Sequence, residues 1–288
     1  YEAVHEIQGW DDLRRRLDPD DRSCFAFFHP SLIDEPLIFV EVALMDDIPG
    51  AIGEVLDEAP KNGEGSRAPT TAVFYSISNC QEGLRGISFG NFLIKQVVED
   101  LVKERPSLRT FVTLSPVPNF ADWLDAVLSG NDSARLVGPE ERERLAVLAD
   151  PDWPGSEAVA ESLRPLLLRL AANYFLTEKA GDGRPLDPVA RFHLGNGARL
   201  ERINWLGDAS PKSLKSAHGL MVNYRYELRD IERNHEAYAN DGFVTASRQV
   251  HALLKQRAKS RTEPATTKLL QIARLRPAKS GADQPEEA

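Results

Sequence analysis

The stretch that decides the fold runs from residue 71 to residue 119. Its β-branched and aromatic runs predict two strands, and one apolar face at helical spacing between them predicts a helix. A strand, a glycine-rich turn, a helix and a second strand in this order indicate an α/β layer. The segments read TAVFYSIS over 71–78, QEGLRGISFGN over 81–91, FLIKQVVEDLV over 92–102, RTFVTL over 109–114 and SPVPN over 115–119.

The rest of the chain extends this pattern in both directions. Residues 139–179 have a helical pattern throughout, and we interpret them as a helical insertion. Beyond about residue 261 the chain is rich in Pro, Thr, Ser and charge, which predicts a disordered tail over 261–288. The other predicted elements are a hairpin-like pair of strands at 23–28 and 37–44 around a connection at 29–36, helices at 11–17, 48–58, 120–128, 140–149, 156–176, 188–193, 230–238 and 244–259, and strands at 199–205 and 219–228.

The composition excludes several classes of protein. The 288 residues are 42% hydrophobic and 27% charged, which does not fit collagen-like, coiled-coil-only or wholly disordered chains. A formal charge of −9 opposes attraction to nucleic acid, and no apolar run reaches the ~20 residues of a membrane span. From Cys24 and Cys80 we expect two reduced, largely buried thiols in a cytoplasmic protein. Because the first residue is Tyr1, we expect a fragment or a processed product.

The glycine-rich turn is the first candidate site. Gly83, Gly86 and Gly90 leave room for a ligand beside the backbone, and the free amides of a helix start suit a pyrophosphate. The turn lacks the Lys-[Ser/Thr] of a P-loop and does not fit G-x-G-x-x-G, so it gives little support to ATP hydrolysis or dinucleotide binding. A tight connection without a ligand explains the same glycines.

Ser115 and His193 are the next candidates. Ser115 precedes a proline, which favours extended geometry, so it ends its strand where open α/β sheets commonly place ligands. His193 falls in the last turn of a short helix that Asp187 caps, and we expect the helix dipole to raise its pKa toward that of a proton donor. Each also has an ordinary structural explanation, as a strand-end serine and a packed histidine. The other histidines lack metal-ligand spacing, so we assign no metal.

Tyr224 and Tyr226 would share one face of a strand over 219–228. One of these phenols could reach a site on that face. A buried tyrosine that only makes a structural hydrogen bond is the alternative.

Several longer strings, taken together and in chain order, resemble the malonyl-CoA decarboxylase family. The resemblance spans about residues 1–254 and rests on all of the strings, because no single one is specific enough. They are RSCFAFFHPS at 22–31, EPL at 35–37, FYSISNCQEGLRG at 74–86, FLIK at 92–95, LSPVP at 114–118, RFHLGNG at 191–197, RINW at 202–205 and NYRY at 223–226.

The resemblance implies a catalytic domain over residues 1–260 with a GNAT-like acyl-CoA-binding fold, a mixed central sheet flanked by helices. It implies that this domain cleaves malonyl-CoA to acetyl-CoA and carbon dioxide, within fatty-acid metabolism and without a cofactor. The catalytic residues it implies are Ser115, His193 and Tyr226. The CoA-binding loop it implies comprises Arg85, Gly86, Ile87, Ser88, Phe89, Gly90 and Asn91.

Two further expectations follow from the resemblance. Some members have an acidic residue where this chain has Ser88, so no role for a carboxylate in that loop is carried over. The family's N-terminal helical domain contributes to oligomer assembly and is missing from this chain, and we expect a homo-oligomer formed through it.

Two other functions remain open from the residues. An acetyltransferase would bind acetyl-CoA in the same fold, but it would do nothing with malonyl-CoA in the absence of an acceptor. A non-catalytic acyl-CoA-binding subunit would bind CoA without turnover, and a helical segment 139–179 that covers the pocket would favour it. Which of Ser115 and His193 donates the proton directly is not decided by the sequence.

Overall fold

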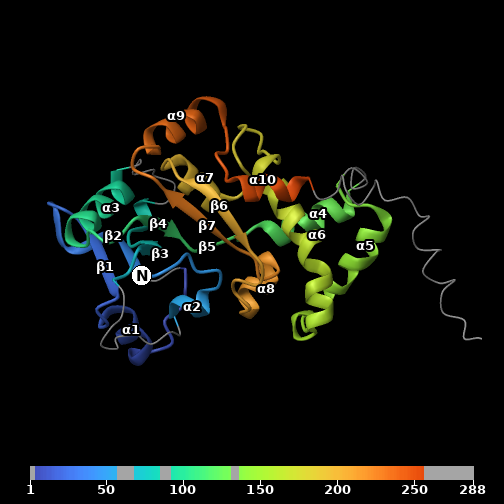
Figure 1. The fold of residues 1–288 in the computed structure, drawn as a ribbon, viewed down its shortest axis with the longest axis horizontal. Coiled ribbons are helices and arrows are strands. Elements are labelled where there is room, and N and C mark those ends of the chain that lie inside the picture. The colour runs from blue at the N-terminus through green and yellow to red at the C-terminus, as the bar shows by residue number, and fades with distance from the viewer. Residues whose placement is uncertain (1–3, 57–67, 85–91, 131–135, 256–288) are drawn as a thin grey trace, which may run out of the picture. The chain divides into compact units, whose positions relative to one another are not determined.

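The central sheet mixes parallel and antiparallel strands, as expected. The structure, a computed structural model, describes residues 4–56, 68–84, 92–130 and 136–255, and the strands of that part form one seven-stranded sheet (Figure 1). The order is β1-β2-β3-β4-β7-β5, and β6 also pairs with β7. Only β3 and β4 are parallel among these described strands. The strands are β1 (Arg22–His29), β2 (Leu32–Met45), β3 (Thr71–Asn79), β4 (Thr110–Thr113), β5 (Ser115–Pro116), β6 (Arg199–Asn204) and β7 (Met221–Tyr226).

Side chains on the two faces of the sheet belong to two apolar clusters. Along β3, Ala72 and Phe74 join the larger cluster, whereas Val73 and Tyr75 join the smaller one, as the period of two in a strand requires. The smaller cluster includes Val55 of α2, and the larger one takes in α3, α4, α6 and α7. The helices are α1 (Trp10–Leu17), α2 (Ile52–Leu56), α3 (Phe92–Glu104), α4 (Phe120–Ser129), α5 (Pro139–Leu145), α6 (Glu157–Leu176), α7 (Pro188–Gly195), α8 (Pro211–Ala217), α9 (Ile231–Asp241) and α10 (Arg248–Leu254).

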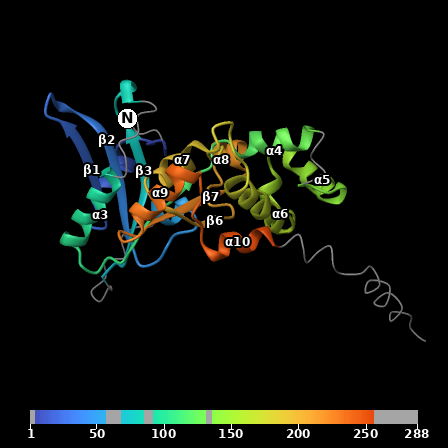
Figure 2. The same cartoon turned by 90° about the horizontal axis from the view of Figure 1, so that it is seen from above.

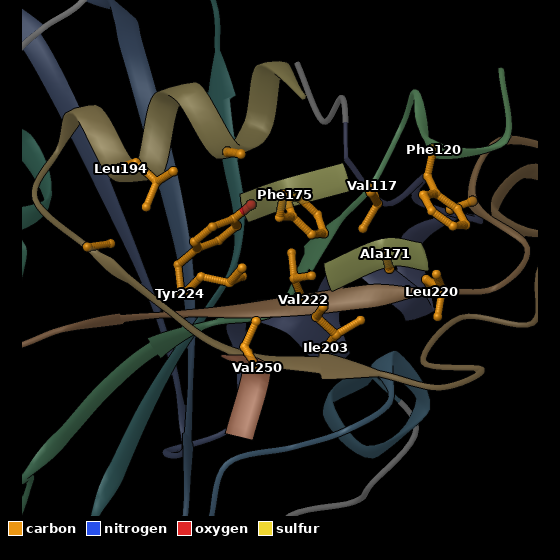
Figure 3. Packing of buried hydrophobic residues seen from close by; sticks show 14 of the residues in the cluster. Val117, Phe120, Ala171, Phe175, Leu194, Ile203, Leu220, Val222, Tyr224 and Val250 are labelled. Carbon is orange, nitrogen blue, oxygen red and sulfur yellow. The ribbon is translucent and has the colours of Figure 1, made fainter. Parts of the chain in front are cut away.

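The larger cluster fixes α6 and α7 against the face of β7. Leu194 points from α7 toward the side of the sheet that carries Tyr224, and Phe175 of α6 lies beside the Tyr224 ring (Figure 3). All three side chains are almost completely buried. Because burying a large apolar side chain stabilises by roughly 1.5–3 kcal/mol, these contacts hold both helices in place.

Residues 139–176 are helical, as expected, and contain α5, two short 3₁₀ turns and α6. α6 continues past Pro165, although an interior proline costs about 3 kcal/mol. Leu163, Leu167 and Leu170 are fully buried in the same helix, and their burial together outweighs that cost. The interpretation of this segment as an insertion remains a prediction.

Several element boundaries differ from the sequence-based ones. α2 begins at Ile52 rather than at residue 48, because the Glu54 carboxylate accepts hydrogen bonds from the amides of Gly50 and Ala51 and so fixes the start of the helix. β2 begins at Leu32, so the hairpin turn is much shorter than the predicted connection at 29–36. α10 begins at Arg248 rather than at residue 244.

α8 was not predicted at all. Its start carries a clear local signal, since the Ser210 hydroxyl accepts a hydrogen bond from the Ser213 amide and Pro211 occupies the first helical position. Residues Tyr1–Leu254 form one compact unit, and the predicted tail 261–288 lies outside the described residues.

The expectation of two buried thiols was wrong. Cys24 is exposed and Cys80 is half-buried. Cys24 lies on β1, which pairs with β2 along one side only, so its side chain has fewer neighbours than in a central strand. No helix in the described part of the chain is both long enough and apolar enough to span a bilayer.

Candidate active site

The Ser115 hydroxyl and two phenols lie on the same side of the sheet. β4 ends at Thr113 and β5 begins at Ser115, so these two side chains, two residues apart, share a face. β7 runs antiparallel to β5 with Val222 opposite Ser115. Because Tyr224 and Tyr226 follow Val222 at intervals of two, both phenols lie on the Ser115 side.

α7 brings His193 to this face. The Asp187 carboxylate accepts a 2.8 Å hydrogen bond from the Ala190 amide, and Pro188 occupies the first turn, as the sequence predicted. His193 falls in the last turn of the helix and is only 4% exposed. The cap and the eight-residue length therefore decide where the imidazole lies along the helix.

α9 packs against α7 and supports its end (Figure 2). His235 Nδ1 donates a 2.6 Å hydrogen bond to the carbonyl of Gly195, the last residue of α7. At Gly197, φ is +79° and an added Cβ would lie 2.2 Å from the Ile231 carbonyl oxygen. Only glycine fits at position 197, and it allows the two helices to approach closely.

The three predicted catalytic residues come together in one hydrogen-bonded chain. His193 Nε2 lies 3.2 Å from Ser115 Oγ, and His193 Nδ1 lies 2.8 Å from Tyr226 Oη. Ser115 Oγ in turn donates a 2.8 Å hydrogen bond to Thr113 Oγ1. All four side chains are buried, with Ser115 the most exposed at 5%. Residues 78 positions apart in the sequence are thus in direct contact.

The hydrogen bonds assign a proton to each atom of this chain. Burial raises the pKa of the Tyr226 phenol well above its usual value, so the phenol keeps its proton. Ser115 Oγ donates its own proton to Thr113, so it accepts from Nε2–H of the neutral His193 ring, and the unprotonated Nδ1 accepts from Tyr226 Oη. The neutral imidazole then carries its proton on Nε2 and donates to Ser115. Ser115 in turn donates a hydrogen bond to Thr113 Oγ1, so the donors follow one another in a single direction from Tyr226 to Thr113.

The expected rise in the pKa of His193 was wrong. Burial lowers the pKa of this imidazole to about 3. The helix end favours a positive charge by about 2 kcal/mol at most, whereas removing an imidazolium from water costs more when no carboxylate pairs with it. The hydrogen-bond partners of its two ring nitrogens are the hydroxyls of Ser115 and Tyr226, so the ring stays neutral.

Aromatic contacts hold the imidazole ring in its plane. The Tyr224 ring stacks on His193 at a centroid distance of 4.6 Å and an interplanar angle of 24°. Phe192 approaches the edge of the ring at 5.0 Å and 79°. Tyr224 was considered as a possible site residue, and its contribution here is a surface for the ring rather than a hydrogen bond to it.

Sequence reasoning missed Thr113. The signal was present, since a hydroxyl two residues before Ser115 in a strand must lie on the same face. The predicted CoA-binding residues Arg85 to Asn91 lie outside the described residues, and Ser88 with them. Within the described residues no group of three or more His, Cys, Asp or Glu side chains could hold a metal ion.

Comparison with known proteins places the chain in a family. The model of the malonyl-CoA decarboxylase C-terminal domain matches residues 1–264. A curated relative, "Malonyl-CoA decarboxylase, mitochondrial" from Anser anser anser, is 40% identical over an alignment that covers 88% of this chain and 54% of that protein. The relative of the same name from Rattus norvegicus is 41% identical, with 88% and 55% covered. This chain spans about half the length of the curated relatives it matches.

Two solved structures are also similar. Malonyl-CoA decarboxylase from Agrobacterium vitis has 60% identity and a TM-score of 0.81, with 88% of this chain and 62% of that chain covered. The enzyme from Rhodopseudomonas palustris has 56% identity and a TM-score of 0.82, with 88% and 61% covered. The names of the curated relatives include a mitochondrial location, so the expected cytoplasmic location is not confirmed. The family model and the shared fold show that this chain belongs to the malonyl-CoA decarboxylase family.

Proposed function

We propose that this chain converts malonyl-CoA to acetyl-CoA and carbon dioxide, within fatty-acid metabolism and without a metal or an organic cofactor. The observation that carries the proposal is the buried chain of donors from Tyr226 through His193 to Ser115. Membership in the malonyl-CoA decarboxylase family supports the choice of substrate.

The reaction requires a proton donor for C2 and does not require a base to remove a proton from the substrate. When the bond between C2 and the carboxylate breaks, its electron pair moves into the thioester and forms an enolate, while the carboxylate leaves as carbon dioxide. C2 must then gain one proton. In the proposed mechanism the Ser115 hydroxyl turns its proton from Thr113 Oγ1 to C2 and delivers it there, and Ser115 takes the Nε2 proton of His193, whose Nδ1 takes the proton of Tyr226. A thioester enolate is a far stronger base than a phenolate, so this transfer runs downhill, and water later restores the phenol.

Burial of the site favours the same reaction. A carboxylate in a dry site loses its hydration, whereas the charge of the enolate is spread over two atoms and can accept hydrogen bonds from fixed donors. The buried Ser115 and His193 side chains provide such a site. Groups that bind the enolate better than the thioester lower the barrier.

The direction of the hydrogen bonds disfavours an acyl-enzyme mechanism. In a Ser-His-Asp triad the third residue accepts a hydrogen bond from Nδ1–H, which leaves Nε2 unprotonated and free to take the serine proton. Here the third residue is Tyr226, which donates to Nδ1, so Nε2 already carries a proton. Ser115 therefore has no base to activate it as a nucleophile. In this arrangement the serine, the histidine and the tyrosine act together as a proton donor.

Two substitutions test the proposal. Ser115→Ala and His193→Asn are expected to lower the kcat of carbon dioxide release by about 10²- to 10⁴-fold while CoA binding is retained. Matched controls are Ser129→Ala and His251→Asn, since both residues are exposed. A folded, CoA-binding variant of either site residue with near-normal turnover would refute the assignment.

The source of the proton can be tested directly. In D₂O, the acetyl-CoA formed should carry a single deuterium at C2, because each turnover takes one proton from the donor chain and ultimately from water. Mass spectrometry of the product measures this. Acetyl-CoA without deuterium would show that the proton does not exchange with solvent before transfer.

We also propose that Arg85 to Asn91 bind the CoA portion of the substrate, through amides at the start of α3. The glycine spacing and the helix start support this role. Arg85→Ala should raise the Kd for CoA while kcat at saturation is unchanged. A variant with unchanged CoA affinity would count against Arg85 as a phosphate contact.

A homo-oligomer assembled through the family's N-terminal helical domain remains part of the proposal. Light scattering of this chain, compared with a longer chain that includes such a domain, tests it. The longer chain is expected to form the larger assembly.

A further inference from the structure

We propose that Thr113 is a positioning residue for the reaction, because its hydroxyl oxygen holds the Ser115 proton and thereby fixes the direction of the whole donor chain. This inference rests on the proposed function. It assigns to Thr113 a role in the chemistry that its place in a buried strand does not by itself suggest.

The surroundings of Thr113 explain why its hydroxyl oxygen acts as an acceptor. Thr113 is fully buried, and its Oγ1 receives hydrogen bonds from Ser115 Oγ at 2.8 Å and from the Tyr224 amide at 3.1 Å. A hydroxyl oxygen has two lone pairs, and these two donors occupy both. Thr113 Oγ1 is therefore the acceptor in both hydrogen bonds, including the one from Ser115.

The backbone of Thr113 is held as firmly as its side chain. Asn223 Nδ2 donates a 2.8 Å hydrogen bond to the Thr113 carbonyl oxygen from the opposite face of the sheet. Oγ1 therefore cannot shift without breaking its bond to the Tyr224 amide, and the Thr113 backbone cannot shift without breaking its bond to Asn223. The acceptor for the Ser115 proton is thus built into the strand pairing.

Without this acceptor the Ser115 hydroxyl has another orientation available. It could turn its proton toward His193 Nε2, but Nε2 can accept only if the imidazole carries its proton on Nδ1. In that state Nδ1 and the Tyr226 phenol would both present protons to each other. Thr113 disfavours this arrangement by giving the Ser115 proton a fixed partner, so that Nε2–H of His193 stays directed at Ser115 Oγ.

Kinetics of two Thr113 variants test the role. Thr113→Val keeps the shape but removes the hydroxyl, and it should lower kcat about tenfold to a hundredfold while KM for malonyl-CoA changes less than about twofold. Thr113→Ser restores the hydroxyl and should recover most of kcat. Unchanged kcat in Thr113→Val, or no recovery in Thr113→Ser when both variants are folded, would overturn the inference.

A double substitution separates positioning from a structural role. Thr113→Val also leaves the buried Tyr224 amide without its acceptor, so the melting temperature will fall to some extent. If Thr113 acts through Ser115, then adding Thr113→Val to Ser115→Ala should cause no further loss of the remaining kcat. An equal loss in both backgrounds would show a structural effect only, and the positioning role would be rejected.

A crystal structure of Thr113→Val decides the inference independently of activity. The Ser115 hydroxyl is expected to leave its position 3.2 Å from His193 Nε2 or to occupy two rotamers. A single unchanged Ser115 rotamer would overturn the inference even if kcat fell. If the unsubstituted chain itself fails to decarboxylate malonyl-CoA, the proposed function is wrong, whereas the rotamer still reports on whether Thr113 orients Ser115.

Discussion

β7 carries a buried polar network on each of its two sides, and the two differ in what they can do. On one side Asn223 Oδ1 accepts hydrogen bonds from Arg202 Nε at 3.1 Å and from Asn204 Nδ2 at 2.9 Å. On the other side, a chain of hydrogen bonds runs from Tyr226 through His193 to Ser115. We call the first the amide network and the second the donor chain.

The difference lies in the chemistry of the groups. The amide network ends on fixed acceptors, since Arg202 donates to the carbonyls of Ile48 and Pro49 and Asn223 donates to those of Pro49 and Thr113. Amides and a guanidinium do not gain or lose a proton near neutral pH. This network can therefore hold loops and strands together but cannot relay a proton. The donor chain consists of hydroxyls and an imidazole, each of which can give one proton and accept another. A buried polar network is thus suited to chemistry only where its groups can relay a proton.

The largest effect is expected from the donor chain. Tyr226→Phe removes the proton behind His193, so protonation of the enolate would have to leave an imidazolate, and kcat should fall about a hundredfold. Tyr238→Phe is the matched control, because the Tyr238 hydroxyl is buried and has no hydrogen-bond partner in the described part of the chain. Steady-state assays of carbon dioxide release measure both. Equal activities of the two variants would remove Tyr226 from the mechanism.

The next effect should appear in stability and come from the amide network. Asn223→Leu leaves the buried Thr113 carbonyl without its donor and Asn204 Nδ2 without its acceptor, and it removes one of several acceptors of Arg202, so the free energy of unfolding should fall by about 2–5 kcal/mol. Asn240→Leu makes the same change at an exposed position of α9 and should alter stability by less than about 0.5 kcal/mol. Denaturant unfolding compares them. A loss below about 1 kcal/mol for Asn223→Leu would contradict a structural role for this network.

A smaller effect should follow from the cap that positions His193. Burial raises the pKa of Asp187 to about 6 from its ordinary value of 3.8. The folded chain therefore binds this proton more tightly than the unfolded chain, so the contribution to stability is full below pH 3.8 and is lost as the pH rises through 6.

Asp187→Asn should accordingly stabilise the chain at pH 7 by about 1–3 kcal/mol, since the amide oxygen can still accept from the Ala190 amide and asparagine caps helices well. The gain should vanish near pH 4. Thermal unfolding at both pH values measures it. A variant less stable than the parent at pH 7 would show that the charge of Asp187 is needed.

The smallest effect is expected from pH on the rate. The pKa of His193 is about 3 and that of the Tyr226 phenol lies well above its usual value, so neither group changes its protonation between pH 7 and 9. kcat should vary by less than about twofold over that range. An inflection there that disappears in Tyr226→Phe would show that the donor chain ionises at these pH values, contrary to the structure.

The parts of the fold that the sequence predicted well are those with strong local signals. The strand at 71–79 and α7, with Asp187 and Pro188 at its start, appear where expected. α2 begins later than predicted because the Glu54 carboxylate fixes its start, and β2 begins earlier because the turn before it is tight. Each shift depends on only one or two contacts. The sequence pattern made Ser115, His193 and Tyr226 candidates one by one, and the resemblance to a family named them together as catalytic. Their contact could not have been read from spacing.

The amino-acid sequence alone determined which faces of its strands and helices are apolar and where several of them begin and end, because alternation and capping depend on neighbours within a few residues. Only the tertiary structure decided that His193 is neutral, since the loss of hydration depends on side chains from α7, β5 and β7 together. It also decided the order of donors from Tyr226 to Thr113. A proton's position depends on every partner around it, and those partners meet only when distant strands pair.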